Sequence, residues 1–318
     1  YIMDRPDFTL NATFNIGRNK NKIDKLASGE KEMVLSSGWA GSQLLNSDDY
    51  RAYVGGTTGL IYGFVNDGFY TVDDFKPFDS KSRTWTLKDG VVNSSPLSGD
   101  PRPGNAKFKK LTPVDENSAN PYTLTDDDRT VIGNTTPKFS GGFGLNATFK
   151  GFDVSAFFNF MYDFDVFNAN KVMMTTWASN NYNNFSMDIS AAKRWRNFDD
   201  MGNEIRYSPE ILAEFNKNAT MWNPTSIGRP IAMSYAVEDG SFLRLNTATI
   251  GYTLPRAWTN KVGLSRVRFY ASGYNLFTIT GYSGYDPEVD IATGLTPNID
   301  NNRYPRSRTY TFGVQLTF

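Results

Sequence analysis

The reactive side chains of this sequence limit the chemistry that it can carry out. Neither cysteine nor histidine occurs among its 318 residues, which removes thiol nucleophiles, disulfides, the usual zinc sites and any catalytic histidine. The best remaining candidates are Asp286 and Glu288, because glycosidases use a pair of carboxylates. Both belong to one Asp-Pro-Glu turn, and this spacing does not show that they face a common substrate. We therefore expect no enzymatic activity and no cofactor.

Aromatic rings offer a second kind of chemistry, the stacking of a ligand such as a glycan. Seven aromatic residues crowd one segment, namely Trp177, Tyr182, Phe185, Trp195, Phe198, Tyr207 and Trp222. We take Trp177, Tyr182, Trp195 and Trp222 as the candidate substrate-binding residues. The alternative is that these rings form the local core of a folded loop. The same segment predicts a short helix over 208–215, with Ser208 as N-cap and Pro209 at its first position.

Six segments alternate apolar and polar residues with the period of two that a β-strand requires. They are residues 8–16, 141–149, 152–160, 241–254, 267–277 and 310–318. Lys150-Gly151 joins the second and third segments as a tight hairpin. In the fourth segment the apolar phase shifts between Leu245 and Ala248, which indicates a β-bulge or the exit of the strand from a membrane.

The connections between these strands differ greatly in length. Residues 17–138, 163–240 and 278–306 are long, whereas 150–151 and about 255–265 are short. The two kinds alternate, which is typical of outer-membrane barrels with short inner turns and long outer loops. Connections this long are unusual in a compact soluble domain. With the long connections outside the cell, the C-terminus is expected to face the periplasm.

The last strand gives the strongest indication of a membrane. Residues 310, 312, 314, 316 and 318 are all apolar and share one face, and the sequence stops on Phe318. A transmembrane barrel needs an apolar lipid face with aromatic residues near the interface, and its last strand pairs with its first. The sequence therefore predicts an all-β, antiparallel transmembrane barrel in contact with outer-membrane lipid. The alternative is a soluble all-β glycan-binding module, with this segment as the last strand of a sandwich.

Composition restricts the partners and the mode of membrane crossing. The 33 basic and 33 acidic residues balance, so a nucleic-acid partner is not indicated. No run of about 18 apolar residues occurs, which excludes a transmembrane helix, whereas barrel strands hide their hydrophobicity in the alternation.

The sequence begins at Tyr1 rather than Met. We interpret it as a mature or truncated piece of a longer chain.

Several longer blocks occur in a recognisable order. They are Asn19-Lys-Asn-Lys-Ile23, Tyr62-Gly-Phe-Val-Asn-Asp-Gly-Phe-Tyr70, Ile132-Gly-Asn-Thr-Thr-Pro-Lys-Phe-Ser-Gly-Gly142, Ser241-Phe-Leu-Arg-Leu-Asn-Thr-Ala-Thr-Ile-Gly-Tyr-Thr-Leu-Pro255, Val267-Arg-Phe-Tyr-Ala-Ser-Gly-Tyr-Asn-Leu-Phe277 and Tyr282-Ser-Gly-Tyr-Asp-Pro-Glu288. Together they resemble the C-terminal portion of the barrel in SusC/RagA-like TonB-dependent outer-membrane transporters. The resemblance spans nearly the whole chain, residues 1–318, and explains Asp286 and Glu288 as part of a loop signature.

The resemblance implies both an architecture and a set of partners. It implies the last strands of a 22-stranded barrel in the outer membrane of a Gram-negative cell, with the plug domain absent from this chain. It also implies import of large nutrients, oligosaccharides or peptides, driven by the TonB complex through the plug, with a SusD-like surface lipoprotein as a lid over the long loops. Six strands are fewer than the 8 of the smallest barrels. The remaining barrel and the plug are expected from a companion chain or from further sequence.

Two features of the family are matched only in part. The C-terminal assembly signal is met at Gly313, Leu316 and Phe318, but Phe312 stands where a polar residue is expected. The family also carries an EF-hand-like acidic stretch in the first long loop. Here Asp115, Asn117 and Asp126 fit ligand positions 1, 3 and 12 of that motif, whereas Ala119 and Asn120 occupy positions 5 and 6, and position 6 requires glycine. We therefore predict a solvated acidic loop and no metal ligand; the alternative is a loop that binds calcium.

Overall fold

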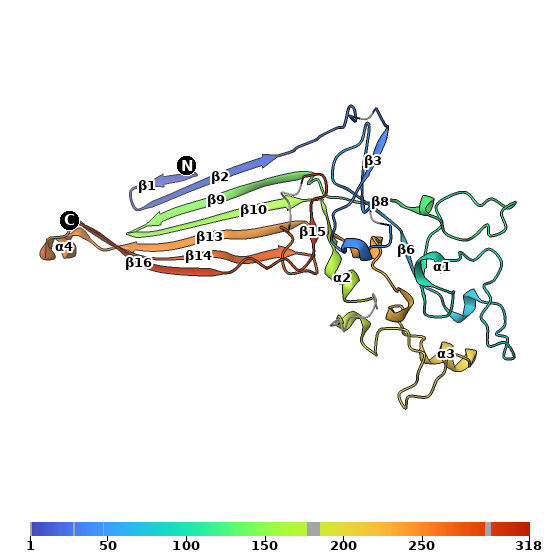
Figure 1. Cartoon of the computed structure of the whole chain (residues 1–318). Helices are drawn as coiled ribbons and strands as arrows, with labels where there is room; N and C mark the ends of the chain where they lie inside the picture. Colours follow the sequence, from blue (N-terminus) through green and yellow to red (C-terminus); the bar gives the residue numbers. More distant parts are fainter. Residues whose placement is uncertain (1, 28, 47, 177–184, 290–293) are drawn as a thin grey trace.

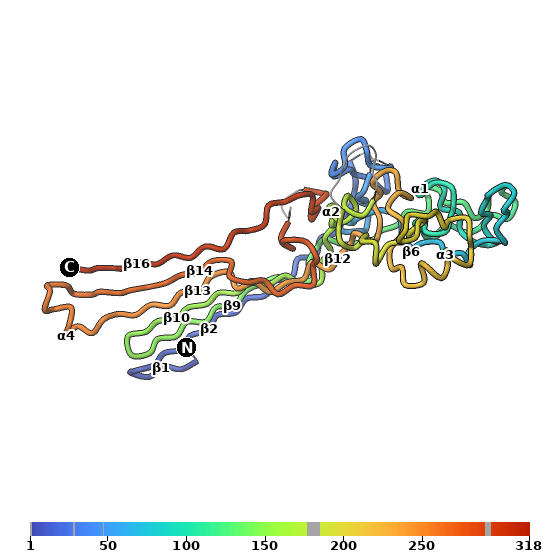
Figure 2. The backbone as a smooth tube through the Cα atoms, turned by 90° about the horizontal axis from the view of Figure 1, so that it is seen from below, coloured from blue at the N-terminus to red at the C-terminus, as the bar shows by residue number. Residues whose placement is uncertain are grey.

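The molecule has two parts, a long sheet and a folded mass of connections at one end of it. The computed structural model describes residues 2–27, 29–46, 48–176, 185–289 and 294–318. In Figure 1 the sheet extends to the left and the connections fold to the right. Figure 2 shows that both labelled ends of the chain lie in the half of the sheet away from the connections.

The strands and helices follow one another along the whole chain. The strands are β1 (Met3–Arg5), β2 (Phe8–Gly17), β3 (Glu32–Leu35), β4 (Tyr50–Tyr53), β5 (Leu60–Gly63), β6 (Asn66–Phe69), β7 (Ala106–Phe108), β8 (Thr130–Asn134), β9 (Phe139–Phe149), β10 (Phe152–Tyr162), β11 (Asp165–Asn168), β12 (Val237–Asp239), β13 (Phe242–Thr253), β14 (Arg266–Thr280), β15 (Ile299–Asp300) and β16 (Thr309–Thr317). The α-helices are α1 (Ser95–Ser98), α2 (Ala169–Met173), α3 (Pro209–Phe215) and α4 (Arg256–Thr259). No helix among the described residues is long and apolar enough to cross a membrane.

The long sheet contains seven antiparallel strands in the order β1-β2-β9-β10-β13-β14-β16. All six strands predicted from the sequence are confirmed in it. The seventh strand, β1, was missed because three residues are too few to show a period of two. Within the described residues β1 and β16 each pair on one side only, so the sheet is open at both edges.

A β-bulge in β13 keeps the apolar residues on one face. Leu245 pairs with Phe158 of β10, but Thr247 pairs with Phe157, so Asn246 is an extra residue in the strand. The same residue is skipped in the ladder with β14. The bulge moves Ala248 and later apolar residues to the face that already carries Leu245. The predicted phase shift is thus confirmed as a bulge.

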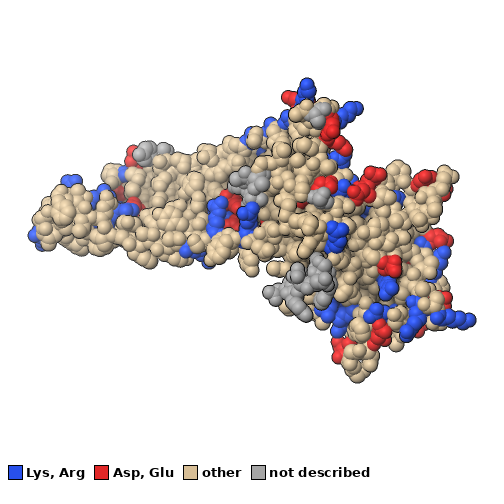
Figure 3. All heavy atoms as spheres, in the orientation of Figure 1, with Lys and Arg blue, Asp and Glu red and all other residues tan. Residues whose placement is uncertain are grey.

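The two faces of the sheet differ in chemistry. One is apolar and crowded with rings: Phe143 stacks on Phe158 with centroids 4.6 Å apart, and Phe312 is 80% exposed. The opposite face carries hydrogen-bonded polar side chains, including a Thr9–Thr148 contact of 2.6 Å between hydroxyl oxygens. Charged residues gather over the connections in Figure 3, whereas the visible part of the sheet is mostly uncharged.

On the polar face an ion pair crosses a strand. Arg268 of β14 reaches over β13 to Asp153 of β10, with Nη2 2.5 Å from Oδ2. The residue between them in β13 is Gly251, where a Cβ atom would lie 2.5 Å from the Arg268 guanidinium and 2.6 Å from the Asp153 carboxylate. Glycine is therefore required for this pair to form, and the pair ties three strands together.

The three long connections fold into one body. β11, from the second connection, pairs with β12 of the same connection and in parallel with β15 of the third. The first connection supplies the sheet β3-β4-β5-β8 and the pair β6-β7, and joins the second through a parallel bridge between Phe64 and Met233. Their shared core includes Trp39, Phe167 and Ile299, one residue from each connection. The predicted third loop, 278–306, is corrected to 281–308, because β14 continues to Thr280 and β16 starts at Thr309.

Two local predictions are also confirmed. Lys150 and Gly151 adopt positive φ angles of 45° and 88°, as a tight hairpin with the twist of a sheet requires. Helix α3 begins at Pro209 after Ser208. The Ser208 hydroxyl makes no capping hydrogen bond, so the start of the helix depends on Pro209 and on the charge of Glu210 near the helix N-terminus.

Candidate functional site

The two carboxylates considered for catalysis are neutralised in a buried ion cluster. Arg244 of β13 places Nη2 2.5 Å from Asp286 Oδ1 and Nε 3.2 Å from Glu288 Oε2. Arg306 adds contacts of 3.4 Å to Glu288 and 4.0 Å to Asp286. The cluster joins Arg244 of one sequence block to the Asp-Pro-Glu turn of another. This arrangement fixes the third connection against the sheet and pairs both carboxylates with guanidinium groups.

The ionisation of Asp286 reflects this environment. Burial acts to raise its pKa, but hydrogen bonds from Arg244 and from the Glu288 N–H, together with the charges of Arg244 and Arg306, outweigh burial. The pKa of Asp286 therefore lies below its ordinary value. Such a group is a permanent counter-ion at neutral pH, whereas a general acid would need a raised pKa.

The candidate aromatic residues lie in different surroundings. Trp177 and Tyr182 fall outside the described residues. Trp222 is 2% exposed within the core of the connections, and its indole N–H donates to the Thr175 carbonyl at 3.3 Å. Trp195 is 3% exposed and packs against Gly104, where a Cβ atom would lie 2.1 Å from the ring. The stacking of these rings on a ligand stays a prediction.

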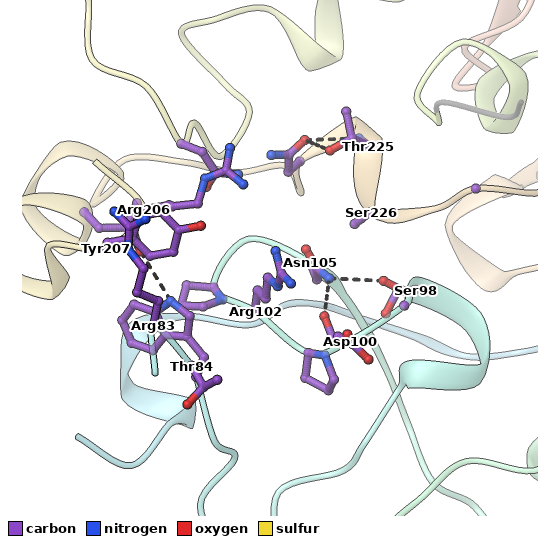
Figure 4. Close-up of a pocket in the computed structure, with 18 residues that line it drawn as sticks. Arg83, Thr84, Ser98, Asp100, Arg102, Asn105, Arg206, Tyr207, Thr225 and Ser226 are labelled. Carbon is purple, nitrogen blue, oxygen red and sulfur yellow. Dashed lines mark hydrogen bonds between the residues drawn. The ribbon is translucent and has the colours of Figure 1, made fainter. Parts of the chain in front are cut away.

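A cavity of about 730 Å³ lies close to Trp195, between the first and second connections. Its lining comes from two segments, residues 83–105 and residues 197–228 (Figure 4). A second cavity of about 620 Å³ includes Trp195 in its lining and shares Asn197, Arg206, Asn223 and Thr225 with the first. The predicted aromatic segment thus forms walls of two adjoining cavities.

The charge of the first cavity is mainly positive. Arg83, Arg102 and Arg206 line it together with a single carboxylate, that of Asp100. The Arg83 guanidinium lies 4.4 Å from the centre of the Tyr207 ring. The Arg206 guanidinium lies 5.7 Å from the centre of the same ring. Tyr207 therefore holds two guanidinium groups at one wall of the cavity.

Local hydrogen bonds set the shape of this cavity. The Asn105 side-chain amide donates to the Ser98 carbonyl at 3.1 Å and to the Asp100 carbonyl at 2.9 Å, which closes the turn that carries Arg102. The Ala106 N–H donates to the Ser226 hydroxyl at 3.2 Å and so joins the two lining segments. The sequence interpretation missed all three arginines, because they lie far apart in the sequence. The segment Pro101-Arg102-Pro103 and the adjacent Arg206-Tyr207 were the signals that could have indicated them.

The residues of the expected assembly signal lie on β16 and directly after it, where Phe318 follows the last strand residue, Thr317. Leu316 and Phe318 are 49% and 91% exposed on the apolar face. Gly313 pairs with Tyr270 of β14, and a Cβ atom on it would lie 2.4 Å from the Tyr270 ring. Gly313 thus makes room for this ring on the polar face. Its role in assembly stays a prediction.

The acidic stretch of the first connection makes hydrogen bonds within the protein. The Asp115 carboxylate accepts the Asn117 N–H at 3.0 Å. Asp126 accepts from Asn46 at 2.5 Å and pairs with Arg129 at 3.1 Å. In the part of the chain that the structure describes, no three side chains of the metal-binding types form a group that could hold an ion.

Comparison with known proteins gives consistent relatives. No family model matches the chain. The chain is 30% identical to TonB-dependent receptor P3 of Formosa agariphila over 318 residues, which are 98% of this chain and 27% of that protein. It is 32% identical to TonB-dependent receptor SusC of Bacteroides thetaiotaomicron over 164 residues, which are 47% of this chain and 15% of SusC.

A solved structure shows the same fold. The RagAB peptide transporter aligns with 100% of this chain and 28% of its own matching chain, with a TM-score of 0.66 and 20% identity. Over most of its length the chain therefore matches receptors and transporters, and no enzyme is among these relatives. The chain spans about a quarter of the length of the curated relatives that it matches over its whole length.

Proposed function

We propose that this chain, a homologue of SusC/RagA-type TonB-dependent receptors over 98% of its length, forms part of an active transporter in the outer membrane of a Gram-negative cell. The transporter imports large nutrients, oligosaccharides or peptides. Energy reaches it from the TonB complex through a plug domain. The chain acts in transport and not in catalysis.

The seven-stranded sheet is the observation that carries this proposal. Its apolar face exposes large side chains such as Phe14 at 67% and Phe312 at 80%, which would be unfavourable in water and suits the hydrocarbon of a membrane. Its polar face carries the Asp153–Arg268 pair and suits the water-filled interior of a barrel. Strands of 10 to 15 residues such as β2 and β14 are long enough for a tilted crossing.

The position of the connections supports the orientation. Short turns lie at the end of the sheet that holds both termini, and all three long connections fold at the opposite end. Barrels of this kind have short periplasmic turns and long extracellular loops. The folded connections are therefore assigned to the cell surface and the C-terminus to the periplasm.

The open edges of the sheet imply further protein. β1 and β16 each leave one side unpaired in the described residues, and unpaired backbone groups are costly in a bilayer. The remaining barrel strands and the plug come from a companion chain or from further sequence. A SusD-like surface lipoprotein covers the folded connections, in keeping with the two-component name of the RagAB peptide transporter.

Detergent partition and nutrient uptake test the proposal together. We expect the protein to partition with outer-membrane detergent extracts, in a heat-sensitive complex with further polypeptide. Crosslinks from residues 17–138 should reach a lipid-anchored protein, and uptake of a large nutrient should stop when TonB is removed. Recovery of a folded, water-soluble monomer of these residues would refute the membrane role and favour the glycan-binding module. Crosslinks to periplasmic proteins alone would reverse the topology.

A further inference from the structure

We propose that the cavity between residues 83–105 and 197–228 binds the anionic groups of an acidic oligosaccharide. As a capture site for a transported nutrient, it rests on the proposed function. As a binding site, it rests on the charge, the geometry and the polar lining of the cavity itself.

The first argument is unpaired positive charge. Within the described residues, neither Arg83 nor Arg102 has a carboxylate within 4 Å, and the Asp100 carboxylate in the same lining forms no ion pair. Only Arg206 is paired, with Glu204. A guanidinium presents five N–H donors in a planar fork that matches a carboxylate or a sulfate. Two such forks at one cavity, with a third arginine beside them, favour an anionic ligand.

The second argument is that Arg83 is positioned before any ligand arrives. Its φ angle is 56°, in the left-handed region that residues other than glycine, asparagine and aspartate rarely adopt. The preceding turn is held by the Asp79 carboxylate, which accepts the Lys81 N–H at 2.9 Å. The Arg83 side chain then lies over Tyr207 at 4.4 Å. A strained residue held in one orientation is characteristic of ligand sites, and it reduces the entropy lost on binding.

The third argument concerns the rest of the ligand. Much of the remaining lining consists of neutral hydroxyl and amide side chains, namely Thr84, Ser98, Asn105, Asn197, Asn223, Thr225 and Ser226. Among the described residues, the side chain of Asn197 and the amide nitrogen of Asn223 make no hydrogen bond, so both remain available to a ligand. Such groups both donate and accept hydrogen bonds, as a ligand dense in hydroxyls does throughout its length. This lining favours a saccharide over an acidic peptide.

The adjoining cavity extends the site. It holds about 620 Å³ and shares Arg206, Asn197 and Asn223 with the first. Phe198 and Trp195 belong to its lining, and Phe198 is 46% exposed, so that its ring can contact a sugar face. An oligomer of several sugar units would therefore occupy both cavities, with Arg206 at the boundary.

Calorimetry on the detergent-purified protein, with its accompanying polypeptides, tests this inference. The probes are an oligogalacturonate, its fully methyl-esterified form, a sulfated galactan oligosaccharide and an oligoglutamate peptide. The methyl ester keeps the sugar backbone but loses the charge, and we expect its Kd to be higher by about tenfold or more. Equal binding of acid and ester, no binding of either acidic saccharide, or tighter binding of the peptide would overturn the inference.

Matched variants locate the site. Arg102→Gln and Arg83→Gln should each raise the Kd for the bound acidic saccharide by about tenfold, as expected for loss of a charge-assisted hydrogen bond. Lys88→Gln removes the same charge from an exposed residue outside both linings and should leave the Kd unchanged. An equal effect of Lys88→Gln would show that only the overall charge matters and would overturn the site.

Uptake separates this inference from the proposed function. TonB-dependent uptake of a neutral glycan or a peptide, without binding of any acidic saccharide, would refute the cavity assignment and leave the transporter intact. Binding that depends on Arg102, in a protein that imports nothing, would refute transport and leave the site intact.

Discussion

Replacing Arg244 with methionine should release the third connection from the sheet. The Arg244 side chain is 3% exposed and its partners Asp286 and Glu288 are 9% and 7% exposed, so the variant would leave two buried carboxylates with only Arg306 nearby. Loss of one partner of a buried ion pair costs about 3–5 kcal/mol. That cost corresponds to a fall of about 100-fold to several thousand-fold in the protection of local amides against hydrogen exchange.

Hydrogen exchange of the peptide covering residues 282–289, followed by mass spectrometry, measures this effect. Arg306→Met is the matched control, because Arg306 is 44% exposed and its contacts are longer. It should cost no more than about 1 kcal/mol. Unchanged protection in Arg244→Met, or equal losses in the two variants, would refute the argument that burial makes this cluster important.

The pH dependence of the same experiment provides a second check. Because the pKa of Asp286 is lowered in the folded protein, its ionised form contributes stability that is present above its unfolded pKa, about 3.9. That contribution is lost as the pH falls through the folded pKa. In Arg244→Met the buried carboxylate should instead have a raised pKa. Acidification from about pH 7 to about pH 5 should then restore protection in the variant and change the wild type little.

Four further predictions concern assembly and the acidic loop. Phe318 is 91% exposed, and its deletion should sharply lower the amount of the protein in the outer membrane. Inserted molecules should melt close to wild type, because one terminal ring contributes at most about 3 kcal/mol to stability. Normal membrane levels with a large fall in melting temperature would contradict this. Gly313→Val should destabilise the protein by about 1–3 kcal/mol in thermal unfolding, because the new Cβ would meet the Tyr270 ring. Combining it with Tyr270→Ala should relieve most of that cost. Additive losses in the double variant would show that the two residues do not conflict. Deletion of Asn246 should abolish heat-resistant folded protein on gels, because it turns part of β13 to the wrong face, whereas Asn246→Ala should be tolerated. Addition of EDTA should leave the melting temperature unchanged, and a fall reversed by calcium alone would show that the acidic loop binds the ion.

The strands of the long sheet could be predicted from the sequence because each repeats its signal several times. A ten-residue strand such as β2 carries five apolar positions on one face, and the shift at Asn246 showed as a break in that pattern. The strands of the connections are short, so that β11 with four residues and β15 with two carry almost no period. Their partners also lie far apart in sequence, as Phe167 and Ile299 do. Pairing of this kind depends on the whole fold.

The candidate site could be predicted only as far as its region. Crowded aromatic residues drew attention to the second connection, but large rings are as useful in a core as at a ligand, and Trp222 lies in the core. The cavity charge comes from Arg83 and Arg102 of one connection and Arg206 of another, and nothing in the sequence shows that these meet. Likewise, Arg244 and the Asp-Pro-Glu turn were visible as separate blocks, and only the fold brings them together.

The shared core of the three connections has a consequence for how ligand specificity would change in a receptor of the proposed kind. Because Trp39, Phe167 and Ile299 come from different connections and pack in one cluster, substitutions in one connection are constrained by the other two. Exchange of a single connection by recombination should yield mismatched chimeras, whereas the three exchanged together should remain compatible. Evolution of a new specificity is then expected to proceed by coordinated change of whole sets, or by substitutions confined to solvent-facing positions such as Arg83 and Arg102, where epistasis is weakest.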